Sequence, residues 1–141
     1  MTAFAKYNCF VEDVAEKVHN LGADALKIAL TNRAPVVGSD VGFSDISEIA
    51  AGNGYAAGGN APAISSSAQT GGVYKLTLAD PATWTAVGGT IGPFRYAVLY
   101  NDTASGKRLI GYWDYGVSVT LQIAETFTVD LDQVNGTLTL T

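Results

Sequence analysis

The chemistry open to this chain is limited by its single histidine and its single cysteine, His19 and Cys9. A serine or cysteine nucleophile needs a base beside it, and a zinc site needs several Cys and His ligands. His19 ends an amphipathic segment, where a cation would meet the negative pole of a helix. A single cysteine excludes an intramolecular disulfide, and free cysteines are commonly buried. We therefore expect a structural His19, a buried reduced Cys9 and no catalytic or metal-binding residues.

Two stretches match ligand-binding loops only in part. In the glycine-rich run 52–58, Ala57 stands where the dinucleotide-binding fingerprint has its third glycine, with no strand before it and no long helix after it. The segment 130–136 has acidic residues at calcium-loop spacing, but Val134 replaces a ligand and no closing glutamate follows. Asn135-Gly136 is instead typical of a hairpin turn. The sequence thus predicts no cofactor.

Carboxylate and aromatic side chains raise the question of carbohydrate chemistry. A carboxylate pair can hydrolyse a glycoside, but the acids here lie mostly on a helix face, in loops or in turns, where solvation explains them. Tyr112, Trp113 and Tyr115 stand close together, and we interpret them mainly as core residues, because aromatic side chains favour strands and bury large areas. Tyr112 and Trp113 are neighbours, so one of them lies at an interface or beneath another element. A carbohydrate-binding platform is the alternative.

Most of the elements that would position these residues are strands. Alternating apolar and polar residues mark the candidates, which are 26–31, 73–79, 82–87, 94–100, 109–113, 117–121, 127–131 and 138–140. The last five are joined by short connections, which favours an antiparallel meander or a sandwich. One segment has helical spacing and predicts a short helix near residues 10–19, with Asn8 as a possible cap. We therefore predict an all-β fold, an antiparallel jelly-roll-like β-sandwich with one short N-terminal helix.

The chain length predicts one domain over residues 1–141, with its own core. The expected inward-facing residues share a parity within each alternating run. They are Leu26, Ile28, Leu30, Tyr96, Val98, Val119, Phe127 and Val129.

Residues 33–72 differ from the rest in their glycine, alanine and serine content, and they predict a long contact loop. With few apolar anchors, such a loop is expected to be mobile until a partner orders it. A merely surface-exposed loop is the alternative. The residues predicted at an interface are Phe43, Ile46, Ile49, Tyr55 and Trp113.

The net charge of −5 argues against nucleic acid as a partner, because nucleic-acid binding needs a basic surface. No basic run would hold the chain on an anionic membrane, and no apolar run approaches the roughly 20 residues that span a bilayer. We expect no signal peptide, and synthesis in a reducing cytosol.

Four phrases resemble a family of small structural proteins of tailed bacteriophages. They are FVEDVAEKVHNLGADALKIALTNRAP at 10–35, DISEIAAGNGYAAGG at 45–59, YKLTLADPATWTAVGGTIGPFRYAVLYNDTA at 74–104 and LIGYWDYG at 109–116. The resemblance carries no catalytic residues. It implies a virion protein made in the host cytoplasm, which decorates or cements the outside of the capsid. Its expected partners are the major capsid protein and further copies of itself, as a dimer or trimer. The alternative is a tail-associated or carbohydrate-binding adhesion module.

Overall fold

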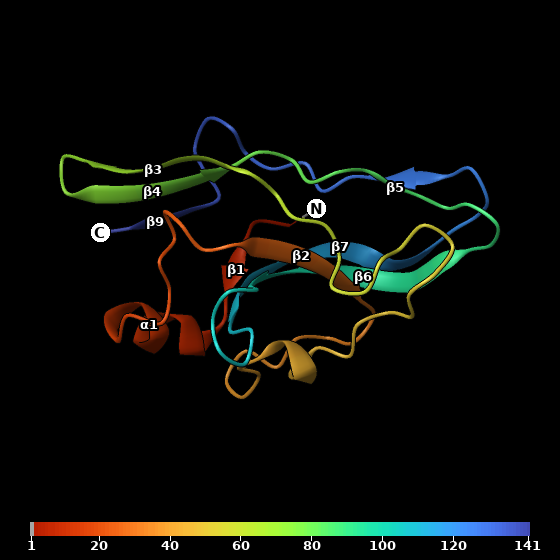
Figure 1. Cartoon of the computed structure of the whole chain (residues 1–141), viewed down its shortest axis with the longest axis horizontal. Coiled ribbons are helices and arrows are strands. Elements are labelled where there is room, and N and C mark those ends of the chain that lie inside the picture. Colours follow the sequence, from red (N-terminus) through yellow and green to blue (C-terminus); the bar gives the residue numbers. More distant parts are fainter. Residues whose placement is uncertain (1) are drawn as a thin grey trace.

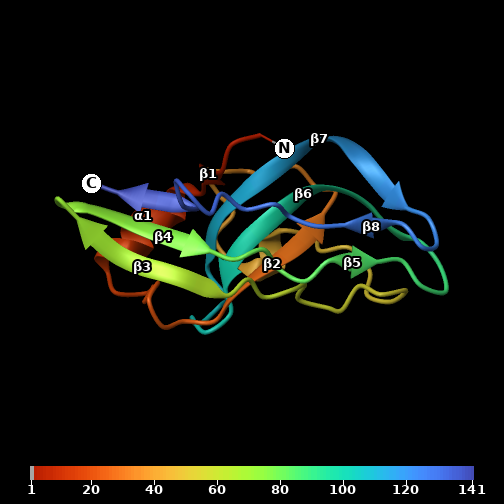
Figure 2. The ribbon, with the colours of Figure 1, turned by 90° about the horizontal axis from the view of Figure 1, so that it is seen from above.

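The computed structural model describes residues 2–141 as two layers of antiparallel strands (Figure 1). The lower layer is a four-stranded sheet in the order β1-β7-β6-β2, formed by Ala5–Lys6, Leu109–Leu121, Ile91–Asn101 and Leu26–Thr31. The upper layer contains the sheet β3-β4-β9, formed by Ile64–Thr70, Val73–Leu78 and Leu138–Leu140, and the pair β5-β8, formed by Trp84–Thr85 and Thr126–Phe127. These two small sheets follow one another along the long axis (Figure 2). The predicted all-β sandwich with one short α-helix is confirmed, and the jelly-roll connectivity stays a prediction.

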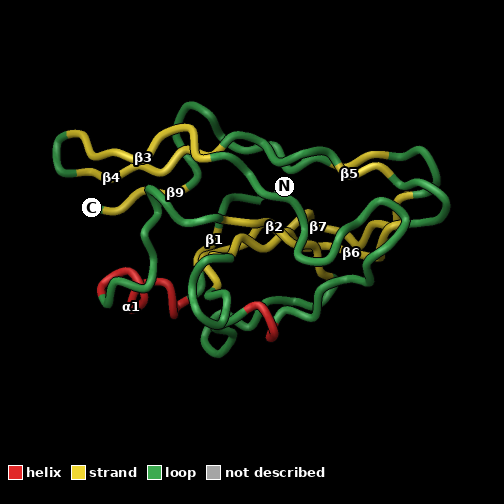
Figure 3. Tube along the Cα trace, viewed as in Figure 1, coloured by secondary structure: helices red, strands yellow, loops and turns green. Residues whose placement is uncertain are grey.

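Helix α1 (Asn8–Ala15) and the 3-10 turn η1 (Phe43–Asp45) lie on the side of the four-stranded sheet away from the upper layer (Figure 3). The helix is shorter than predicted, because Lys17 adopts a left-handed φ of 66° and Val18 N–H bonds back to the Asp13 carbonyl at 2.8 Å. Asn8 is not its cap. The N-cap is Tyr7, without a side-chain hydrogen bond.

The alternation predicted for strand β6 is interrupted by irregular pairing. Its ladder with β7 shifts register between Phe94 and Tyr96, whose partners are Val119 and Asp114. Phe94 therefore faces the upper layer, whereas Val98 points to the opposite face. The predicted inward orientation of Tyr96 and Val98 was wrong, because a bulge moves every later side chain to the other face.

Of the two arrangements expected for the last five strand candidates, a meander or a sandwich, the meander is not found. Among these candidates only β6 and β7 pair as sequence neighbours, because the segments 109–113 and 117–121 belong to the single strand β7. Strand β8 pairs with β5, and β9 pairs with β4. Asn135-Gly136 therefore does not join two paired strands. Its turn instead carries the chain from one small upper sheet to the other.

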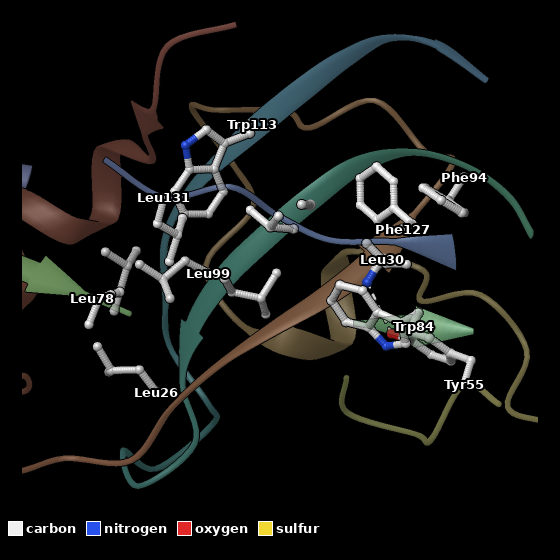
Figure 4. Close-up of a cluster of buried hydrophobic side chains, with 14 of the residues drawn as sticks. Leu26, Leu30, Tyr55, Leu78, Trp84, Phe94, Leu99, Trp113, Phe127 and Leu131 are labelled. Carbon is white, nitrogen blue, oxygen red and sulfur yellow. Dashed lines mark hydrogen bonds between the residues drawn. The ribbon is translucent and has the colours of Figure 1, made fainter. Parts of the chain in front are cut away.

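The main core lies between the two layers (Figure 4). Leu26, Ile28 and Leu30 of β2 are at most 2% exposed and face this core, as predicted. Phe127 and Val129 join them from the upper layer, also as predicted, whereas Val119 faces this core but is only half-buried. Aromatic rings fill the end near β5 and β8, where the Phe94 and Phe127 ring centroids are 4.9 Å apart.

The segment predicted as a loop over residues 33–72 contains a strand, since β3 occupies Ile64–Thr70. The part before β3 lies along the free edge of β2. Asn60 exchanges two backbone hydrogen bonds with Ile28, at 2.8 and 3.0 Å, and Ile49 N–H donates to the Leu30 carbonyl.

Two further contacts fix this segment in place. Leu30 N–H donates to the Tyr55 phenol oxygen at 3.0 Å, so both outward backbone groups of Leu30 are bonded. Gly59 has a φ of +78°, and a side chain there would collide with the Ile28 carbonyl. The segment is thus anchored by its own chain, contrary to the expectation that it has few anchors.

Candidate functional site

The residues predicted at an interface lie mostly inside the protein. Ile46 and Tyr55 are 1% and 2% exposed, so they cannot contact a partner in this conformation. Trp113 is 7% exposed and reaches the surface only where it lines a groove. Phe43 and Ile49 are half-buried, and the Phe43 ring packs on Tyr100 with centroids 4.7 Å apart. Apolar residues in an irregular segment fit a partner surface and an intramolecular anchor equally well. The sequence therefore did not distinguish these two roles.

A second buried cluster covers the outer face of the four-stranded sheet. It is formed by Tyr7, Ala29, Ile46, Val98, Tyr100 and Leu109. Tyr112 packs against this cluster while its neighbour Trp113 faces the main core, so the predicted division between them is confirmed. Cys9 is half-buried at its margin, with Sγ 3.7 Å from the Asp40 carbonyl oxygen. Burial raises the pKa of the Cys9 thiol, which favours the protonated form.

His19 is a neutral residue in a buried polar network, which corrects the expectation of a cation at a helix end. Its Nδ1 lies 3.0 Å from Asn101 Nδ2. The Asn101 Oδ1 already accepts the N–H groups of Thr103 and Ala104, so Nδ2 must donate and His19 Nδ1 must accept. Burial is the largest influence on the His19 pKa and lowers it.

The same network contains an almost buried ion pair. Arg108 donates two hydrogen bonds to Asp13, at 2.8 and 3.0 Å, and the Asp13 side chain is 5% exposed. This pair joins α1 to the start of β7. The network therefore positions the helix, and within residues 2–141 no group of His, Cys, Asp and Glu side chains is arranged to hold a metal ion.

Two grooves open on the surface. The larger, about 930 Å³, lies between the N-terminal segment beside β7 and the segment 128–140. Phe4, Trp113 and Tyr115 contribute aromatic side chains to it, and Asp130 contributes a carboxylate. The smaller, about 530 Å³, lies between the end of α1 and the sheet β3-β4-β9. The sequence analysis singled out Trp113 and Tyr115 as aromatic residues of interest. It did not identify the other residues that line the larger groove, because those residues come from the two ends of the chain.

Two exposed apolar residues stand on neighbouring turns at the end of the molecule near β5 and β8. Val87 is 65% exposed and Ile123 is 64% exposed. They stand on adjacent turns, since Ala124 N–H donates to the Ala86 carbonyl at 2.8 Å. We refer to Val87 and Ile123 as the apolar tip.

Among the residues described, no helix has the length and apolar character needed to cross a membrane. Comparisons with protein-family models, with curated proteins and with solved structures found no match.

Proposed function

We propose that this protein is a non-enzymatic virion component that binds the outer surface of a tailed-phage capsid as a homo-oligomer and stabilises it. The apolar tip carries the proposal. Two large aliphatic side chains on adjacent turns remain exposed in a chain that has buried most of its other apolar residues. Exposed apolar groups that cluster, rather than occur singly, are typical of contact sites.

Two further features support this function. The body is a two-layer β structure whose longest irregular segment is hydrogen-bonded along β2, so it can present a fixed surface to repeated partners. The net charge of −5 suits an outer surface that does not contact packaged DNA. On a closed shell, weak contacts are strengthened by effective concentration when copies are joined as oligomers.

The test compares particles assembled with and without the chain. Particles that lack it should rupture at a lower temperature, and imaging should place its density on the capsid exterior. Val87→Asp and Ile123→Asp should reduce the number of copies bound per particle without changing the fold. Val134→Asp is the matched control, because Val134 is 79% exposed but stands on the turn before β9. Density on the tail, or full occupancy by both tip variants, would refute the proposal.

The second candidate is an adhesion module that binds carbohydrate. The observation that favours it is the larger groove, which combines aromatic side chains with hydroxyl and carboxylate groups.

A further inference from the structure

The larger groove is lined by the N-terminal segment and β7 of the lower layer and by the segment 128–140 of the upper layer. Its volume of about 930 Å³ is within the range of sites that hold small organic ligands. One wall comes from the N-terminal segment and β7, and the other comes from residues 128–132 and 136–140. The two walls differ in chemistry.

The wall on the β7 side is aromatic. Phe4 packs on Trp113 with ring centroids 5.0 Å apart, and Tyr115 remains 43% exposed. The Tyr115 ring is held edge-on by Phe127, with centroids 5.5 Å apart and planes at 71°. A supported but exposed aromatic ring offers a flat apolar surface, which suits the C–H face of a pyranose.

The opposite wall is polar. Thr137 lines this wall but is only 9% exposed and its Oγ1 is buried, so the polar groups that a ligand can reach belong to exposed residues. The exposed Asp130 and Thr139 stand along the same wall. Carboxylates accept hydrogen bonds from sugar hydroxyls and repel anions. The lining carries two of them, Asp130 and Asp132, against the single cation Lys6, so it disfavours an anionic ligand.

We propose that this groove binds a short neutral oligosaccharide. Tyr115 and Phe4 pack against its rings, and Asp130 and Thr139 bind its hydroxyl groups. The proposal stands independently of the capsid assignment, because it rests on the groove and not on the apolar tip.

An extended peptide is the competing occupant, since β1 and β9 are edge strands that flank the same groove. β1 contains only two residues and β9 only three, so neither strand can form more than a few backbone hydrogen bonds with an added peptide. The hydroxyl-rich lining, which includes Thr2, Thr128 and Thr139, fits a saccharide better.

The experiment is a titration of the ¹⁵N-labelled full chain with soluble cello-, malto- and chito-oligosaccharides of roughly two to four units, followed by NMR. The chain has two tryptophans, which give two indole N–H signals. The Trp113 signal should shift with at least one neutral series. The signal of Trp84, which is 1% exposed and does not line the groove, should stay in place. A sialylated trisaccharide should bind more weakly than the best neutral one.

Variants then test the two walls. Tyr115→Ala should weaken binding by about tenfold, because it removes the exposed ring, and Asp130→Asn should weaken it by a smaller factor. Val117→Ala is the control, since Val117 is 60% exposed on the same strand but does not line the groove. The proposal fails if no neutral oligosaccharide moves the Trp113 signal, or if Tyr115→Ala binds as the unmodified chain does. It also fails if only virion proteins move that signal.

Discussion

The two faces of the four-stranded sheet are buried in different ways. The inner face packs against another layer of strands, and its core draws on almost every element of the fold. The outer face is covered by the irregular segment around Ile46 and by the residues at the start of α1. Both coverings exclude water equally well. Ile28 on the inner face and Ala29 on the outer face are each 0% exposed. The comparison teaches that side chains can be buried without regular secondary structure around them. How far the surroundings can move into a cavity left by a mutation, however, should depend on whether those surroundings are strands or a loop.

The inner face should be the more costly to disturb. Ile28→Ala should lower the free energy of unfolding by about 4–5 kcal/mol, near the top of the usual range, because its side chain is enclosed between two layers of strands that prevent the cavity from collapsing. Urea denaturation of the purified chain measures this. A loss below about 2 kcal/mol would mean that the inner face relaxes as easily as a loop.

Loss of the ion pair that joins α1 to β7 should have the second largest effect on stability. Arg108→Ala leaves Asp13 buried without its partner and should cost about 3 kcal/mol. Arg95→Ala is the matched control, because Arg95 also forms a two-fold hydrogen-bonded pair, with Asp114, but in a more exposed position. Thermal unfolding of both variants should show a clear loss for Arg108→Ala and little change for Arg95→Ala. Equal losses would show that burial of the pair does not matter.

The outer face should tolerate the same deletion better. Ile46→Ala should cost about 2 kcal/mol, at the low end of the range, because the irregular segment can move into the space that is left. Ile46 is 1% exposed, so its burial matches that of Ile28 and only the surroundings differ. If the two isoleucine variants lose equal stability in the same urea series, the proposed difference between the faces is wrong.

The smallest expected effect is on the pH dependence of stability. The pKa of His19 is lowered in the folded protein, whereas in the unfolded chain it is near its ordinary value of 6.5. Below pH 6.5 the unfolded state therefore binds more protons, so stability should fall as the pH falls from 6.5 toward the lower folded pKa. In His19→Gln the amide oxygen can still accept from Asn101, and the denaturation midpoint should lose this part of its pH dependence. An unchanged slope in the variant would assign the effect to other groups.

The sequence predicted the strands better than their arrangement. The alternation of Leu26, Ile28 and Leu30 was sufficient to identify β2 and its inner face. It failed in β6 because both faces of that strand are buried from Ala97 to Tyr100, which leaves no polar side to set the parity. The pairing of β9 with β4 was not predictable, because it joins segments that are far apart in the chain.

The groove and the apolar tip were even harder to predict from the sequence. Phe4 and Thr137 stand near opposite ends of the chain, and nothing in either local pattern indicates that they line one groove. In the sequence, Val87 ends a predicted strand and Ile123 lies in a predicted connection between two strands. Only the pairing of β5 with β8 places their turns together. Long-range pairing, which local patterns do not encode, decided both features.

The hydrogen bonds that the segment before β3 makes with β2 also affect how copies of the protein behave when crowded together. An edge strand with unpaired backbone groups is a template on which another chain can add, which leads to aggregation. Here the outward N–H and carbonyl groups of Ile28 and Leu30 are already bonded to Asn60, Ile49 and Tyr55. Another copy therefore cannot extend the four-stranded sheet by pairing with Ile28 and Leu30. The glycine-rich segment thus removes one edge of the sheet on which aggregation could start.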